Sequence, residues 1–199
     1  MRSFSLILTT MSTFMFFLLP SPVFSGQPKN QMSESINRLK AILDERSLKG
    51  SHNSLLRRNK LRIIFEQRFD FDEMAKRSLS RAWRKRTREE KKDFLFSFKY
   101  LLESTYIGKI EQYNGQTVQF IKELIDGNYA KVKTLVITKE QPIRVYYKMH
   151  KKKENWLVYD VIIEGVSLIK TYRDQFKSIL SRSSFSDLLD KMRAKQFAN

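Results

Sequence analysis

The sequence predicts an α+β fold, in which helices at both ends of the chain pack on a twisted antiparallel sheet of about four strands and enclose an apolar cavity. Two changes in the spacing of apolar residues support this. Residues 29–113 carry apolar side chains at helical spacing, and from Gly115 to Ile163 the period falls to two. After Gly165 the helical spacing returns. Helices, then a meander of strands, then helices is an α+β order.

Three helices are expected before the long central one. They span residues 33–45, 54–68 and 72–86, and a polar stretch containing Gly50 separates the first two. The second has Leu61, Ile64 and Phe65 on one face, as a helix packed on a core requires.

The longest helix is expected from Thr87 to about residue 113. Thr87 and Glu90 have the spacing of a capping box, which satisfies free N–H groups at a helix start. Apolar residues from Phe94 to Tyr106 cover more than one narrow stripe of this helix, so we expect burial on two sides. Either this is a central core helix, or it faces the sheet on one side and a ligand on the other.

Four strands are expected at residues 117–125, 129–138, 143–149 and 156–163. Asp126-Gly127 between the first two is a strong hairpin signal. The helices that follow should span 166–180 and 185–195. Asp160 is the one acid inside an apolar strand, and we expect it to pair with an arginine or a backbone N–H rather than to act as a general base.

Residues 1–25 have the organisation of a secretory signal peptide. Arg2 precedes an apolar run from Phe4 to Leu19, and Val23 and Ser25 are small residues three and one before a cut at Gly26. The alternative is an uncleaved membrane anchor, but the run is shorter than the roughly 20 residues that span a bilayer. We therefore expect an exported protein with one domain over residues 26–199.

The charge balance is strongly basic, with 38 Lys and Arg against 21 Asp and Glu. The leader holds one arginine and no acid, so its removal lowers the formal net charge from +17 to +16. Export argues against nucleic acid as the partner, although basic chains often bind it. Phosphate-bearing membrane surfaces are the favoured anionic partner, and a role in solubility alone is the other alternative.

Several kinds of chemistry are excluded or disfavoured. The chain has no Cys and only two His, so thiol catalysis is excluded and a multi-histidine metal site is not expected. The six Gly are too widely spaced for a dinucleotide-binding or P-loop motif. Ser167 lies at a strand-to-helix turn, as in a nucleophile elbow, but the second Gly of that motif is missing. We therefore expect a binding protein without cofactor, metal or catalytic residues.

Two segments resemble the motifs of the MlaC (toluene-tolerance) family. The first runs from Phe69 to Leu79 and continues to Trp83-Arg84; the second runs from Tyr159 to Leu168 and continues to Tyr172-Arg173. The Tyr-Asp-Val…Glu-Gly-Val-Ser-Leu string is the specific part, and the resemblance covers about residues 35–195. The sequence departs from the pattern at Ser80, Thr171 and the turn 150–155, which leaves the local turn shapes open.

The resemblance implies a periplasmic carrier of glycerophospholipids. Members of the family exchange lipid between an outer-membrane lipoprotein complex and an inner-membrane ABC transporter, and so maintain outer-membrane lipid asymmetry. By this resemblance the expected ligand is a glycerophospholipid, the expected partners are those two complexes with transient contact to membranes, and Ser167 has no catalytic role.

A carrier of this kind needs an apolar cavity for the acyl tails. The expected lining comes from the apolar strand face, the long helix and the closing segment, although a plain core explains each residue equally well. Arg144 and Lys148 are possible contacts for lipid phosphates or acidic partners. The expected lipid-binding residues are Phe98, Leu102, Tyr106, Val132, Val136, Val145, Tyr147, Met149, Val166 and Leu168.

Two other functions stay open from the sequence. One is an exported basic module that binds anionic polymers or surfaces without lipid cargo, and its binding should depend steeply on salt. The other is a lipid esterase that uses Ser167, whose activity the substitution Ser167→Ala should abolish.

Overall fold

The computed structural model describes residues 27–48 and 50–194. The predicted signal peptide, residues 1–25, lies outside this part of the chain. Within the described residues, no helix combines the length and the apolar character needed to span a bilayer.

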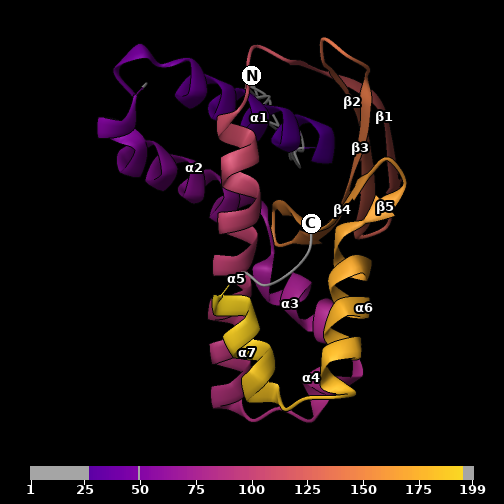
Figure 1. Ribbon diagram of the computed structural model, residues 1–199. Coiled ribbons are helices and arrows are strands. Elements are labelled where there is room, and N and C mark those ends of the chain that lie inside the picture. Colours follow the sequence, from indigo (N-terminus) through magenta and orange to yellow (C-terminus); the bar gives the residue numbers. More distant parts are fainter. Residues whose placement is uncertain (1–26, 49, 195–199) are drawn as a thin grey trace, which may run out of the picture.

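Helices form the first half of the fold (Figure 1). The predicted loop between the first two consists of short 3-10 turns at Arg46–Leu48 and Ser51–Asn53. Thr87 and Glu90 make both hydrogen bonds of the predicted capping box at the start of α5. The helices are α1 (Pro28–Asp44), α2 (Ser54–Arg68), α3 (Phe71–Leu79), α4 (Arg81–Arg84) and α5 (Arg88–Glu111).

The predicted helix at 72–86 is two helices, because the chain turns sharply at Ser80. This residue adopts φ 52° and ψ −121°, a conformation that favours glycine. A continuous helix cannot pass through a positive φ, so α3 ends here and α4 begins. The prediction of one helix was wrong at this point, and the position is one of those where the sequence departs from the family pattern.

The sheet is antiparallel and open, with strand order β1-β2-β3-β4-β5. The α+β prediction is confirmed, but the sheet has a fifth strand that sequence spacing assigned to a helix. Glu164 and Gly165 both have positive φ in the tight turn that precedes it. The strands are β1 (Thr117–Asp126), β2 (Tyr129–Ile137), β3 (Ile143–Lys152), β4 (Asn155–Ile163) and β5 (Val166–Ser167).

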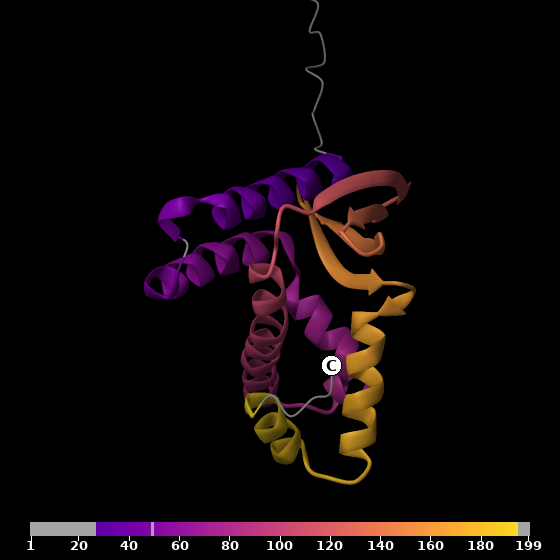
Figure 2. The ribbon, with the colours of Figure 1, turned by 45° about the horizontal axis from the view of Figure 1, so that its top comes forward.

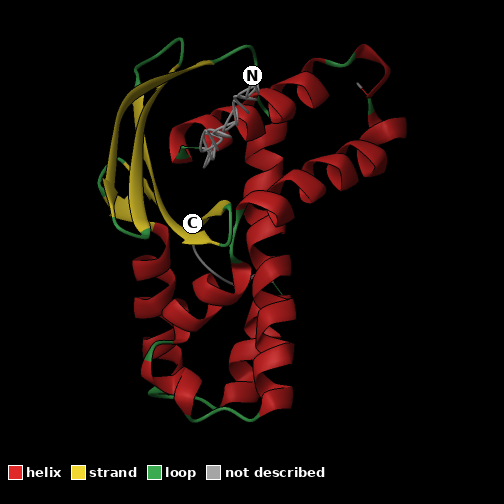
Figure 3. Cartoon of the chain, turned by 180° about the vertical axis from the view of Figure 1, so that it is seen from behind, coloured by secondary structure: helices red, strands yellow, loops and turns green. Residues whose placement is uncertain are grey.

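Two more helices, α6 (Leu168–Leu180) and α7 (Phe185–Arg193), follow the sheet. They complete a helical half of the molecule with α3, α4 and α5, while α1 reaches the sheet and α2 packs beside α1 (Figures 1 and 2). Seen from behind, α1 and α2 run side by side and project away from the sheet (Figure 3). The sheet and the helical half therefore meet only along part of their surfaces.

Each half has its own buried cluster. The helical cluster is built around Phe94, Phe98 and Phe176, whose rings contact one another. The sheet cluster packs Met32 and Ile36 of α1 on the inner face of the strands, where it buries Ala130, Val132, Met149, Trp156, Val158 and Val161. Two separate cores leave the region between them free to form a site.

The apolar arc of α5 is not buried on every side. Phe94, Phe98 and Leu101 are fully enclosed, whereas 73% of the Phe96 side chain is exposed. The prediction that this helix is covered on two sides therefore fails at Phe96, since no described element packs over that face.

Asp160 has the structural partners that the sequence predicts. Its carboxylate accepts a hydrogen bond from the backbone N–H of Ile169 at 3.1 Å and another from the Ser167 hydroxyl at 2.8 Å. The buried acid therefore anchors the start of α6 to β4, because its charge is placed beside free N–H groups at a helix N-terminus.

Candidate functional site

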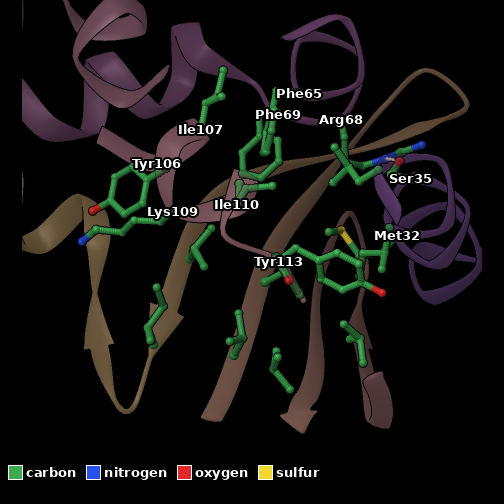
Figure 4. Close-up of a pocket in the computed structure, with 18 of the residues that line it drawn as sticks. Met32, Ser35, Phe65, Arg68, Phe69, Tyr106, Ile107, Lys109, Ile110 and Tyr113 are labelled. Atoms are coloured by element: carbon green, nitrogen blue, oxygen red, sulfur yellow. Dashed lines mark hydrogen bonds between the residues drawn. The ribbon is translucent and has the colours of Figure 1, made fainter. Parts of the chain in front are cut away.

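A cavity of about 690 Å³ lies between the concave face of the sheet and the helices that cover it. In Figure 4 the strands form one wall, and side chains from α1, α2 and α5 form the wall opposite. This volume is within the range of about 300–1,000 Å³ that encloses small-molecule ligands.

The sheet wall follows the alternation of each strand. Residues two apart point to the same face of the sheet, so the part of β2, β3 and β4 that is not covered by α1 lines the cavity with every second residue. Val136 pairs with Ile143 across β2 and β3, and Tyr147 pairs with Val161 across β3 and β4, which places neighbouring lining residues side by side. The sheet residues that line the cavity are Val118, Val136, Thr138, Ile143, Val145, Tyr147, Val161 and Ile163.

The helical wall is equally apolar. From α1 it takes residues at helical spacing, including Met32, Ile36, Leu39 and Leu43. The junction of α2 and α3 adds aromatic side chains, and the last turns of α5 close the wall. These lining residues are Phe65, Phe69, Phe71, Met74, Leu102, Tyr106, Ile107, Ile110 and Tyr113, and Leu168 adds to them from α6.

The pKa of Tyr147 indicates that the surroundings of its side chain in the cavity wall have low polarity. Its side chain keeps some accessible surface, but that surface faces the cavity. Burial raises the pKa of the Tyr147 phenol to about 12, although a hydrogen bond with Thr134 acts in the opposite direction. An ionised phenol would therefore be poorly solvated here, as in an apolar binding site.

Four charged side chains also line the cavity: Lys40, Arg68, Glu103 and Lys109. Arg62 pairs with Glu103 at 2.8 Å, which neutralises the one acid. Arg68 is buried and donates to neutral groups, to Ser35 Oγ at 2.9 Å and to the Trp156 carbonyl at 2.7 Å. Burial lowers the pKa of the Arg68 guanidinium. The wall therefore carries an excess of positive charge.

A second, smaller pocket of about 190 Å³ adjoins the first. The two share Tyr106, Ile163 and Leu168, and the smaller one also contacts Val166, which is 62% exposed. The cavity therefore continues toward solvent between α5 and the β4–β5 turn.

The structure brings six of the ten residues expected at the site into contact with the main cavity. These are Leu102, Tyr106, Val136, Val145, Tyr147 and Leu168. Val132 and Met149 lie on the same sheet face but belong to the core beneath α1, and Phe98 belongs to the helical core. Val166 lines only the smaller pocket.

Arg144 and Lys148 do not line the cavity. Arg144 is paired with Glu164 at 2.7 Å on the surface, and Lys148 lies 3.6 Å from Asp160. Side chains alternate between the two faces of a strand. Ile143 and Val145 on either side of Arg144, and Tyr147 before Lys148, point into the cavity, so Arg144 and Lys148 point to the outer face of the sheet.

Sequence spacing did not identify the contribution of α1, nor Arg68 and Lys109. The helical pattern of Ile36, Leu39 and Leu43 was visible, but a pattern does not say which part of a sheet a helix will cover. Phe69 and Phe71, the aromatic residues of the first family motif, were the one signal available for the α2–α3 junction.

Nothing in the described residues forms a recognisable catalytic or metal centre. The Ser167 hydroxyl donates to Asp160 and accepts from the backbone N–H of Lys170, as a helix cap. His150 pairs with Asp70 at 3.1 Å. In residues 27–48 and 50–194, no three His, Cys, Asp or Glu side chains are grouped to hold a metal ion.

Comparison with known proteins agrees with this geometry. A family model described as the MlaC protein matches residues 33–194. The intermembrane phospholipid transport system binding protein MlaC of Haemophilus influenzae is 30% identical over 110 residues, which are 52% of this chain and 51% of that protein. This chain therefore spans about half the length of that curated relative.

A solved structure matches over a larger part of the chain. It is the phospholipid-binding protein of Ralstonia solanacearum in complex with a phospholipid, with a TM-score of 0.76 and 25% identity over 85% of this chain and 96% of that one. The resemblance carried by the two sequence motifs is thus confirmed, and this chain belongs to the MlaC family.

Proposed function

We propose that this protein binds a glycerophospholipid, with the acyl tails in the cavity, and carries it through the periplasm between the two membranes. The observation that carries the proposal is the apolar cavity between the sheet and the helices. The similarity of this chain to the phospholipid-bound protein of Ralstonia solanacearum supports a phospholipid as the ligand.

The free energy of transfer from water favours binding of the acyl tails rather than of the headgroup. A phospholipid carries on the order of 30 tail methylenes at about 0.8 kcal/mol each, so exposing them to water costs roughly 20 kcal/mol or more. An apolar wall with few polar groups replaces the membrane for these tails through dispersion contacts. A carrier of this kind lowers the barrier to moving lipid through water.

The family role supplies the route. An outer-membrane lipoprotein complex and an inner-membrane ABC transporter would load and unload the protein, which would maintain the lipid asymmetry of the outer membrane. The chain has no sequence motif for ATP, so we assign the energy source to the transporter. The biochemical activity that fits this role is lipid binding without catalysis. Ser167 then serves only to cap α6.

The test is to extract the protein, purified from cells, with organic solvent and to analyse the extract by mass spectrometry. We expect intact phospholipid. A matched pair of variants on β2 links the lipid to the cavity, since Val136 lines it and Leu135 points to the opposite face of the sheet. Val136→Trp should fill the space and reduce the lipid recovered, and Leu135→Trp should not.

Circular dichroism keeps loss of lipid apart from loss of folding. An empty extract from the fully folded wild-type protein contradicts the proposal and favours the basic binding module. Fatty acid and lysolipid in place of intact lipid would favour the esterase.

A further inference from the structure

The two lysines of the cavity wall differ in their surroundings. Lys40 has Asp44 four residues further along α1, the spacing at which opposite charges meet on a helix. Lys109 has no acid three or four residues away, because those positions hold Thr105, Tyr106, Gln112 and Tyr113. Its charge is therefore not offset within its own helix.

The acids closest to Lys109 in the sequence of α5 are already engaged. Glu111 accepts from Arg57 at 2.9 Å and from Arg58 at 3.0 Å, and Glu103 accepts from Arg62. Among the described residues, the Lys109 amine lies over the Tyr106 ring, whose centre is 5.7 Å away, and pairs with no carboxylate. An exposed cation beside an apolar cavity is thus left without an anionic partner.

Lys109 lies at the end of the cavity that reaches solvent. In Figure 4 its amine and the Tyr106 hydroxyl point in the same direction, away from α1. Tyr106 is also one of the residues shared by the main cavity and the smaller pocket, which continues to the exposed Val166. A lipid whose tails fill the cavity would leave through this end.

The hydroxyl beside Lys109 adds a second polar group. Tyr106 and Tyr172 share a hydrogen bond, and Tyr172 also bonds with Thr105. These three hydroxyls form a short chain that ends at Tyr106. An ammonium group and a hydroxyl at one mouth, with no carboxylate of residues 27–48 and 50–194 paired to the ammonium, match the oxygens of a phosphate group.

We propose, on the basis of the lipid-binding function above, that Lys109 binds the phosphate of the lipid headgroup and that the end of the cavity at Lys109 and Tyr106 is the headgroup end. The protein therefore selects phosphate-bearing lipids over neutral lipids with the same tails. Arg68 does not take this role, since its guanidinium is turned to α1 and β4 and donates to Gln31, Ser35 and Trp156.

The test uses two probes with identical tails, dioleoylphosphatidylglycerol and dioleoylglycerol, present in equal amounts in phosphatidylcholine vesicles. The full-length protein is equilibrated with the vesicles and separated from them, and the ratio of the two lipids bound to it is measured by mass spectrometry. We expect Lys109→Gln to lower this ratio about fivefold, the factor that matches about 1 kcal/mol for one lysine beside an anionic lipid.

Two further variants isolate the charge and its position. Lys109→Arg should keep the wild-type ratio, since it keeps the cation. Lys92→Gln, an exposed lysine near the other end of the same helix, should also leave it unchanged. Added inorganic phosphate should not change the ratio, whereas a site for free phosphate would lose its preference for the phosphate-bearing lipid.

The outcomes separate this inference from the proposed function. A wild-type ratio in Lys109→Gln, with both lipids still bound, overturns the headgroup role of Lys109 and leaves the carrier intact. Absence of all lipid, phosphatidylcholine included, from every folded variant overturns the carrier and the headgroup site with it.

Discussion

The Nε2 atom of His150 lies 3.1 Å from the Oδ2 atom of Asp70, and this contact joins the start of α3 to the end of β3. The Lys152 amine is 3.3 Å from the same oxygen, and the other carboxylate oxygen accepts from the backbone N–H of Glu73. One buried acid therefore caps a helix and connects the two halves of the molecule.

Asp70 should make stability depend on pH in the acid range. Burial raises the pKa of its carboxyl, but the Glu73 N–H, Lys152 and His150 outweigh burial and bring it below the ordinary value of 3.8. The folded state thus binds a proton less readily than the unfolded state. This stability is complete above pH 3.8 and is lost as pH falls through the lower folded value.

The substitution Asp70→Asn checks this. At neutral pH we expect a loss of about 2 kcal/mol in the free energy of unfolding, the cost of removing a charged hydrogen-bond acceptor. In urea titrations the gap from wild type should narrow as pH is lowered below 3.8. Asp93→Asn, at an exposed position, should have little effect, and a gap that stays constant with pH would contradict the assignment.

Ser167 should matter for stability and not for chemistry. Its hydroxyl accepts from Lys170 N–H at 3.1 Å and donates to Asp160 at 2.8 Å. Ser167→Ala should cost about 1–2 kcal/mol in thermal or urea unfolding, as expected for an N-cap with a buried partner. The lipid recovered from the folded variant should be intact and match the wild type. A hydrolysis product that disappears in Ser167→Ala would instead support an esterase.

Ser80 occupies a backbone conformation that suits glycine. At φ 52° and ψ −121° a side chain is strained, at a cost of about 1–3 kcal/mol. Ser80→Gly should therefore stabilise the protein by about 1 kcal/mol after the extra freedom of the unfolded chain is subtracted, and raise Tm by about 2–4 °C. Calorimetry can compare it with Ser178→Gly inside α6, which should change Tm in the opposite direction. Equal losses in both variants would argue against strain at Ser80.

Arg68 should hold α1 in place over the cavity. Its guanidinium connects Gln31 and Ser35 of α1 with the carbonyl of Trp156 in β4. Arg68→Met keeps most of the apolar stem but leaves these acceptors without their donor, so we expect a loss of about 2 kcal/mol.

Hydrogen exchange locates the effect of that substitution. Amide exchange should accelerate in α1 and stay unchanged in α6 and α7, which belong to the helical half. Arg38→Met serves as the control, because the hydrogen bond from Arg38 to Gln67 is exposed. Uniform acceleration over the whole chain would mean that Arg68 supports the fold globally rather than α1.

The sequence predicted the inner face of the sheet better than it predicted the cavity. Alternation alone places Val132, Val136, Val145, Tyr147 and Met149 on one face, and the register confirms this. Whether such a residue meets space or another side chain depends on where α1 lies. Met32 and Ile36 cover Val132 and Met149, and the cavity begins beyond them.

Other features were beyond the reach of local patterns. The two residues of β5 are too few to show a period of two, and the helical spacing of α6 runs directly up to them. Lys109 is one of many lysines in a basic chain, and only the fold places it at the mouth of a cavity. A lysine at a binding site can be told from an ordinary surface lysine only when its charge partners and its position beside the cavity are both known.

Phe98 provides the sharpest contrast between core and site on one helix. It is fully buried against Phe94, Tyr172 and Phe176, with ring centres 5.7–6.0 Å apart. Tyr106, two turns further along α5, faces the cavity. Phe98→Ala should therefore cost about 3–5 kcal/mol in unfolding free energy, as expected for a large aromatic side chain removed from a core.

The lipid content separates the two positions. The fraction of Phe98→Ala that remains folded should carry as much lipid as the wild type, since the cavity wall is unchanged. Tyr106→Ala should cost less stability, because its side chain is only partly buried, and should change the lipid that is recovered. Loss of lipid from fully folded Phe98→Ala would mean that the acyl tails reach into the helical core, and that the boundary between core and cavity moves when lipid binds.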